Sequence, residues 1–166
     1  MANIVSGRIT PAIYLQAQQL HRARALKIAY ICCAVLALAG LAGFALGYRW
    51  GGVVSGGAIG GLLGQLAVEK FYVPYKVNKL YGQYKDLSGE FTMTWDSQYL
   101  QGQGASGHSQ RLWANYCKWK EDKHVFLLYI ADNLYEVMPK AWFADTDAAV
   151  MDDFRRCASQ IGNVAP

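Results

Sequence analysis

The chain has few of the residues from which catalytic and metal sites are built. Only three of its 166 residues are histidine and four are cysteine. The histidines are too scattered for a metal site, so we expect neither a metal nor a cofactor. Cys32 and Cys33 are adjacent, whereas Cys117 and Cys157 lie far apart downstream, which provides no disulfide framework. A reduced, cytosolic environment is therefore expected for the soluble part of the chain.

Charged residues are also sparse. They make up 17% of the chain, and the formal net charge is +4. The sequence has no lysine- and arginine-rich run and no recognisable reading helix, which argues against a nucleic-acid partner. Hydrophobic residues, in contrast, make up 53% of the chain and are concentrated between Ile28 and Val68. This distribution is typical of a membrane protein, with the lipid bilayer as its first partner.

The apolar block is long enough for two membrane-spanning helices. Ile28–Tyr48 contains no charged residue, and its roughly 21 residues match the thickness of a bilayer. A signal peptide is the alternative, but the segment begins late and more apolar sequence follows it directly. Trp50–Val68 is less hydrophobic and includes Ser55 and Gln65. We expect it to insert as the second half of a transmembrane helical hairpin over residues 28–70.

Small residues recur at helical spacing in both predicted spans. Residues four apart lie on one helix face, and a face of small residues lets a second helix approach closely. We expect the two rows to pack face to face near the outer turn. The rows are Gly52, Gly56, Gly57, Gly60, Gly61 and Gly64 in the second span, and Ala39, Gly43 and Gly47 in the first. Packing within the pair is the simplest interpretation, and a homo-oligomer seam or a partner's docking groove is the functional alternative.

The distribution of basic residues predicts the orientation of the hairpin. Arg8, Arg22, Arg24 and Lys27 precede it and Lys70, Lys76, Lys79 and Lys85 follow it, whereas only Arg49 lies between the two spans. Because positively charged flanks stay in the cytoplasm, both termini are expected on the cytoplasmic side of a bacterial inner membrane. Lys70, Lys76 and Lys79 are also expected to contact anionic lipid, with about 1 kcal/mol of attraction each.

The segments that flank the hairpin are shorter. Residues 1–27 are expected to form a short strand over Asn3–Ile9, followed by an amphipathic helix that lies at the inner membrane surface. Thr10 and Pro11 form a typical helix start. The predicted apolar stripe of this helix consists of Ile13, Ala17, Leu20 and Ala23. Residues 71–88 are interpreted as a basic juxtamembrane linker.

Residues 89–166 are predicted to form a cytosolic domain rich in strands. Short runs with alternating or continuous apolar residues predict strands near 91–95, 99–103, 112–119, 124–130 and 134–138. The continuous run His124–Ile130 should be a central strand. Turns are expected at Gly104–Gly107 and after Ala131, and Pro139 should end the last strand.

A helix follows these strands at the end of the chain. Asp145 or Thr146 is expected to cap it, and its predicted buried stripe consists of Val150, Phe154, Cys157 and Ile161. The predicted fold class is therefore a membrane α+β protein. An N-terminal transmembrane hairpin precedes a small antiparallel PH-like barrel or sheet that the C-terminal helix closes.

Several short motifs resemble the YcxB-like family. They are Trp113–Tyr116, Lys118 and Glu121, the strand Val125–Tyr129, and Val137–Phe143. The lead-in from Ile9 to His21 is also similar to the start of that family's pattern. The resemblance implies the same architecture, a two-helix membrane hairpin with a PH-like domain. It implies no catalytic residue and no agreed biochemical role.

The sequence offers one arrangement that resembles a catalytic pair. Cys117 and His124 would lie on neighbouring strands as nucleophile and base. The simpler interpretation is that Cys117 is a packed core thiol and that His124 opens a strand at the surface. The acidic residues at 145–153 are explained by helix capping and a solvated face. We therefore expect no catalytic residue.

These observations favour a non-enzymatic inner-membrane protein whose cytosolic domain binds another protein. The specific hypothesis is an immunity protein that neutralises a toxin by direct binding. The alternative is a structural envelope or lipid-interacting protein that forms homo-oligomers through its glycine-rich helix. An enzyme that uses Cys117 and His124 is the third class.

Overall fold

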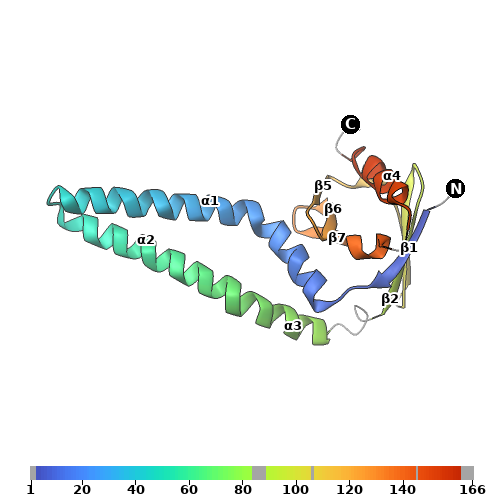
Figure 1. The fold of residues 1–166 in the computed structure, drawn as a ribbon, viewed down its shortest axis with the longest axis horizontal. Helices are drawn as coiled ribbons and strands as arrows, with labels where there is room; N and C mark the ends of the chain where they lie inside the picture. Colours follow the sequence, from blue (N-terminus) through green and yellow to red (C-terminus); the bar gives the residue numbers. More distant parts are fainter. Residues whose placement is uncertain (1–2, 84–88, 106, 145, 162–166) are drawn as a thin grey trace. The chain divides into compact units, whose positions relative to one another are not determined.

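The computed structural model describes residues 3–83, 89–105, 107–144 and 146–161 (Figure 1). The chain divides into two compact units. One, called here the sheet unit, combines Met1–Leu20 with Asn78–Pro166. The other, called here the hairpin unit, is His21–Val77.

The first sheet of the sheet unit includes a strand from the very start of the chain. Its order is β1 (Asn3–Arg8), β2 (Glu90–Trp95), β3 (Tyr99–Gly104) and β4 (Gly107–Leu112), all antiparallel. β1 pairs with β2 along its whole length, from Asn3 opposite Trp95 to Arg8 opposite Glu90. Residues 1–27 and residues 89–166 are separate segments by sequence pattern, whereas this ladder joins them. The helical hairpin is thus an insertion between two paired strands.

The second sheet has the predicted apolar strand at its centre. Its order is β5 (Lys118–Glu121), β6 (Val125–Ala131) and β7 (Leu134–Pro139). Five consecutive residues of β6, from Val125 to Tyr129, are buried. Alternate side chains of a strand point to opposite faces, so β6 needs cover on both faces of the sheet. The prediction of a central strand is confirmed.

The single strand predicted over residues 112–119 is wrong, because the chain turns there. β4 ends at Leu112, and the 3-10 turn η3 (Trp113–Asn115) precedes β5. Trp113 and Tyr116 are both buried in the same core, whereas a strand would direct residues three apart to opposite faces. The Trp113 indole N–H also donates a hydrogen bond to the Asp96 carbonyl at 2.9 Å. Burial of both aromatic rings therefore requires the turn.

The C-terminal helix α4 (Ala148–Ala158) fills the space between the two sheets. Its predicted stripe is buried, since Phe154, Cys157 and Ile161 are all part of the core and Val150 packs against it. The Phe154 ring lies 5.1 Å from the rings of Trp95 and Phe126, in the edge-on or tilted geometries that aromatic pairs prefer.

The residue that caps α4 is Asp147. Its side chain accepts a hydrogen bond from the Ala149 amide at 3.3 Å, as helix N-caps do. The predicted cap Thr146 instead donates its hydroxyl to the Phe143 carbonyl at 2.8 Å. The other predicted cap, Asp145, lies outside the described residues.

The second face of β6 is covered by the first turns of α1 (Pro11–Ala45). Ala17 of this helix is fully buried, and Ile13 and Leu20 pack beside it. Their partners on the sheet are Val125, Leu127, Tyr129, Tyr135 and Val137. The prediction that this stripe lies at the membrane surface is therefore wrong for Ile13, Ala17 and Leu20, because these three residues cover the sheet. The apolar side chains of this helix are removed from water by packing on β6, as they would be by contact with lipid.

The hairpin unit contains most of α1 and most of a second long helix. The second is built from α2 (Arg49–Ala67), the π-helical turn η1 (Val68–Tyr72) and α3 (Val73–Gln83). Both helices are long and apolar enough to cross a membrane, and little of either span is buried within the protein. At 1.5 Å per residue, 35 residues extend about 52 Å, more than the roughly 30 Å of hydrocarbon. Large apolar side chains such as Val35, Leu38 and Leu63 point outward.

An ionic cluster ties three elements of the sheet unit together. The Glu121 carboxylate of β5 accepts from Lys140 Nζ at 2.5 Å and from Arg155 at 2.8 and 3.1 Å. Lys140 begins the turn η4 (Lys140–Phe143), and Arg155 belongs to α4. Hydrogen bonds from Arg155, followed by Lys140, lower the pKa of Glu121 below its ordinary value of 4.5.

Replacement of Glu121 by glutamine should destabilise the sheet unit at neutral pH. The folded pKa of Glu121 is depressed, so its stabilisation is complete above the unfolded pKa and is lost as the pH falls through the folded value. We expect Glu121→Gln to lower the free energy of unfolding by about 1–2 kcal/mol at pH 7. The loss should shrink when the pH is taken well below 4.5. Denaturant titrations followed by tryptophan fluorescence at several pH values measure this difference.

The matched control is Asp132→Asn. Asp132 pairs with Lys118 at 2.6 Å, but its side chain is 92% exposed, so its removal should change stability very little. If Glu121→Gln lowered the free energy of unfolding by the same amount at every pH, the assignment of a lowered pKa to Glu121 would be wrong.

Candidate functional site

The closest contact between the two helices of the hairpin is made by four small residues near the turn. They are Gly40 and Gly43 on α1, and Gly51 and Ser55 on α2. A Cβ atom added at Gly51 would lie 2.2 Å from the Phe44 amide nitrogen, and one at Gly40 would lie 2.6 Å from that of Ser55. Neither position has space for a side chain, so backbone packs against backbone here.

The predicted glycine ladder is not the face of α2 that meets α1. A Cβ added at Gly56, Gly57, Gly60 or Gly64 would meet no atom within 4 Å. The buried residues of α2 are Gly51, Ser55 and Ala58. Gly52 and Gly56 each follow a buried residue by one position, which rotates them by about 100° away from the contact. The prediction that the two small-residue rows pack face to face is corrected accordingly.

The other small residues of the two predicted rows lie outside the close contact between the helix backbones. Gly52 faces the Phe44 ring, with a Cβ distance of 3.6 Å, and Gly61 lies at the edge of the contact, 3.9 Å from Cys33 Sγ. Ala39 is exposed. Gly47 ends α1 with a φ of +86°, and the Tyr48 amide reaches back to the Gly43 carbonyl at 3.0 Å. This is a Schellman turn, which favours glycine for its left-handed backbone.

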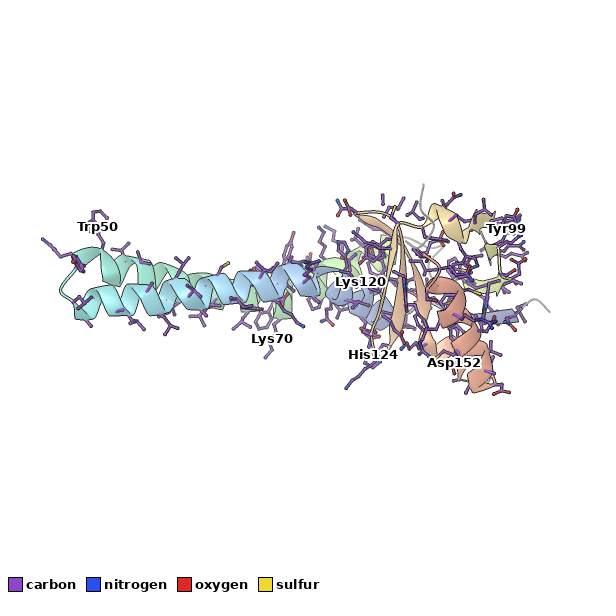
Figure 2. All side chains as sticks on the ribbon, turned by 90° about the horizontal axis from the view of Figure 1, so that it is seen from above. Trp50, Lys70, Tyr99, Lys120, His124 and Asp152 are labelled. Atoms are coloured by element: carbon purple, nitrogen blue, oxygen red, sulfur yellow. The ribbon has the colours of Figure 1, made fainter. Side chains whose placement is uncertain are left out.

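The basic residues predicted to contact lipid are exposed on the second long helix. Lys70 lies in η1, and Lys76 and Lys79 lie in α3. Figure 2 shows Trp50 at the turn of the hairpin and Lys70 far from it along the same helix. This spacing keeps Lys70 away from the outer end of the hairpin. Contact with anionic lipid stays a prediction.

The sheet unit contains a groove that the sequence analysis missed. It has a volume of about 550 Å³ and lies between the two sheets. The apolar part of its wall includes Ile9, Phe91, Met93, Leu134, Val137 and Trp142. Tyr14 and Gln18 of α1 line it as well. Ligand-binding sites have this size range and this mixture of apolar walls with a few polar groups.

Glycines at two inward positions of β3 make room for the side chains of Met93 and Phe91, which line the groove. Leu100 points into the core, and Gly102 and Gly104 follow at alternate positions on the same face. A Cβ at Gly102 would lie 3.0 Å from Met93 Sδ, and one at Gly104 would lie 2.8 Å from the Phe91 ring. The sequence signal was therefore present: glycine replaces the apolar residue that strand alternation demands.

The acidic residue of the groove is paired with cationic and phenolic groups. Glu136 lines the wall. Its carboxylate accepts a hydrogen bond from the Tyr116 hydroxyl and lies 3.5 Å from Arg111 Nε. The Arg111 guanidinium also lies 5.9 Å from the centre of the Tyr116 ring. Burial, and then the hydrogen bond to Glu136, raise the pKa of Tyr116, so this group stays protonated. The groove therefore has no unpaired acidic group among its described lining residues.

The pair Cys117 and His124 is not brought together. The ladder between β5 and β6 runs from Lys118 opposite Tyr129 to Glu121 opposite Phe126, and the two residues lie beyond its opposite ends. The prediction that Cys117 is a core thiol is wrong, because it is exposed, whereas Cys157 is the buried thiol. Burial raises the pKa of Cys157. Within the described ranges, no group of three or more histidine, cysteine or acidic residues is arranged for a metal ion.

Residues 95–158 match a family model described as YcxB-like protein. The matched segment begins at the last residue of β2 and ends at the last residue of α4. It includes β4 and β7, which line the groove, and excludes β1 and the hairpin. No curated protein and no solved structure matches the chain.

A disulfide cross-link tests the helix contact. Gly61→Cys should form a disulfide with Cys33, because the added Cβ lies 3.9 Å from Cys33 Sγ. The experiment uses a chain in which the other three cysteines are replaced by alanine, oxidised in membranes. The loss of both free thiols is then counted by maleimide labelling.

Gly57→Cys is the matched control, since no atom lies within 4 Å of its Cβ position. We expect at least a tenfold higher yield for Gly61→Cys within one chain. Equal yields at the two positions would contradict the described helix contact.

Proposed function

We propose that this chain, whose residues 95–158 belong to the YcxB-like family, is a non-enzymatic bacterial inner-membrane protein that binds a partner protein. The observation that carries the proposal is the open groove in the sheet unit, which has apolar walls and a neutralised acidic group. Such a surface suits recognition, because binding requires shape and apolar area, and no reactive side chain.

The strand order supports a PH-like architecture for the sheet unit. A four-stranded and a three-stranded antiparallel sheet pack around one core, and a C-terminal helix closes it. In this interpretation the membrane hairpin is inserted into the connection between the first two strands. The groove and the hairpin are then separate parts of one protein, one for binding and one for anchoring.

The pairing of β1 with β2 supports the placement of both termini on one side of the membrane. The chain leaves the sheet at Arg8 and returns to it at Glu90, so a membrane-spanning insertion between them must cross an even number of times. Two crossings agree with the two helices long and apolar enough to span. The basic residues at both ends of the hairpin favour the cytoplasmic side.

Immunity to a toxin is the specific function that we propose for this architecture. A small anchored protein without chemistry of its own neutralises a toxin by covering its active or pore-forming surface. The anchor concentrates the binding domain at the membrane, which raises the effective concentration against a target that arrives there.

Co-expression with the reading frame next to its gene tests this function. We expect the full chain to restore growth when that neighbouring protein is toxic, and we expect the two proteins to co-purify. Phe154→Asp is the matched variant, because it places an unpaired charge in a fully buried position and should unfold the sheet unit while leaving the hairpin.

The outcomes separate the two parts of the protein. Rescue by the full chain and loss of rescue in Phe154→Asp support binding by the sheet unit. Rescue by both would assign the activity to the hairpin, and no rescue by the full chain would exclude immunity to that neighbour.

A second function is favoured by the open glycine face. We propose as the alternative that Gly56, Gly60 and Gly64 pack against a second copy of the chain, since no atom of the chain itself covers them. Close approach of two backbones along such a face stabilises helix pairs in lipid. The protein would then be a homo-oligomeric structural component of the envelope.

Bulky substitutions on this face should abolish self-association. Gly56→Leu combined with Gly60→Leu is expected to lower a membrane two-hybrid signal to background, because the added side chains keep the helices apart. Val54→Leu is the matched control, an exposed apolar residue of the same helix. Unchanged association in the double variant would exclude the glycine face as an oligomer seam.

A further inference from the structure

The described strands of the sheet unit form two sheets with four edges, and three of these edges carry a feature that disfavours pairing with another strand. Unpaired edges invite pairing with other chains, and proteins usually cover or charge them. Beside β1, the Trp142 ring packs on the sheet face at Gly7, and its indole N–H lies 3.5 Å from the Arg8 carbonyl. β5 presents the ammonium groups of Lys118 and Lys120, both over the Tyr129 ring. β7 lies next to a register shift in β6 and ends at Pro139.

The edge of β4 has none of these features. β4 pairs with β3 through six uninterrupted pairs, and among the described residues no strand pairs with its other side. Its residues Gly107–Gln110 are all exposed and include no lysine, arginine or acidic residue. Arg111, further along the strand, is half-buried with its Nε 3.5 Å from Glu136. A regular and accessible edge of this kind is a site for addition of another strand.

The hydrogen-bond pattern identifies which backbone groups face this open edge. The Trp113 amide donates to the Gln98 carbonyl at 3.1 Å, at the position just beyond the ladder. Antiparallel pairs alternate, so Arg111, Ser109 and Gly107 also bond toward β3. The backbone N–H and C=O groups of His108 and Gln110 therefore point away from the sheet.

The groove lies against the same strand. Its wall includes Gly107, His108 and Ser109 of β4 and the run Asn133–Val137, which covers the first four residues of β7. A strand added beside β4 would direct alternate side chains to the inner face of the sheet. Those side chains would meet Leu134, which is 58% exposed, and the neighbouring apolar wall.

We propose that the partner binds as an extended segment that pairs with the β4 edge and inserts alternate apolar side chains into the groove. The inference rests on the proposed protein-binding function and names its mode. The paired state of Glu136 argues for uncharged inserted residues, because an inserted charge would lack a partner there. The exposed face of the added strand carries no such constraint.

A variant of one residue tests this mode. Gln110→Pro removes an N–H that faces the open edge and that the ladder with β3 does not use. Proline at such a position is tolerated within an edge strand but cannot donate to an added one. Gln110→Ala is the matched control, because it removes the same side chain and keeps the N–H. Leu134→Gln tests the groove without a change in β4.

The probe is an uncharged eight-residue peptide of alternating valine and threonine, capped at both ends, added to the full chain in detergent. We expect binding measured by fluorescence anisotropy, and slower amide hydrogen exchange in residues 108–112. Gln110→Pro should weaken binding at least tenfold and Leu134→Gln several-fold, whereas Gln110→Ala should bind as the unchanged chain does. Circular dichroism of each variant checks that the sheets are retained.

Three results would overturn the inference. They are absence of peptide binding by the unchanged chain, equal binding by Gln110→Pro and Gln110→Ala, and protection from exchange that lies outside β4. Self-association that Gln110→Pro abolishes would also overturn it, since the edge would then pair with a second copy.

The proposed function is judged separately by growth rescue. Rescue that survives in Gln110→Pro leaves partner binding in place and rejects strand addition. Loss of rescue in Gln110→Pro, together with retained rescue in Gln110→Ala, supports both.

Discussion

The pairing of β1 with β2 is the constraint on which the rest of the structure depends. The two strands are adjacent in space although about 80 residues separate them along the chain. Closing so large a loop costs conformational entropy, and the long α-helices reduce that cost because they are already ordered by their own hydrogen bonds. The ladder makes the hairpin an insertion between β1 and β2, so both ends of the hairpin connect to the same sheet.

The core of the sheet unit depends on β6 as a strand with two buried faces. One face packs into the aromatic cluster around Phe154, and the other packs under Ala17 of α1. Each face has a separate cover, one from the C-terminal helix and one from the first turns of α1. These turns therefore belong to the folded sheet unit and also begin a helix that is long and apolar enough to span a membrane. The same turns line the groove through Tyr14 and Gln18.

Small residues have three distinct roles in this chain. Gly40 and Gly51 allow backbone contact inside the hairpin, and Gly47 ends a helix with a left-handed backbone. Gly102 and Gly104 let the side chains of Met93 and Phe91 lie directly against the inner face of a strand. The ladder from Gly56 to Gly64 faces away from the hairpin contact. One residue type at similar spacing thus has different consequences, which depend on what lies opposite it.

Much of the fold was predictable from local pattern alone. Alternation of apolar residues indicated β2, β3 and β7, a continuous apolar run indicated β6, and helical spacing indicated the stripe of α4. The two apolar segments and the family resemblance were likewise legible, because hydrophobic length and short motifs are properties of neighbouring residues. The break at Trp113 was not, since it follows from which core two distant rings share.

What only the tertiary structure decided concerns contacts between residues far apart in the chain. The sequence of α1 shows an apolar stripe, but whether lipid or a sheet covers Ile13 and Ala17 depends on the second face of β6. The glycine ladder is plain in the sequence, yet which helix face meets α1 depends on the rotation that the turn at Gly47 imposes. The groove and the open edge of β4 likewise arise from how two sheets meet. The periodicity of apolar residues shows which face of a helix or strand is buried, but it does not show what covers that face. The free energy of burial depends on the apolar area removed from water, whichever surface covers it.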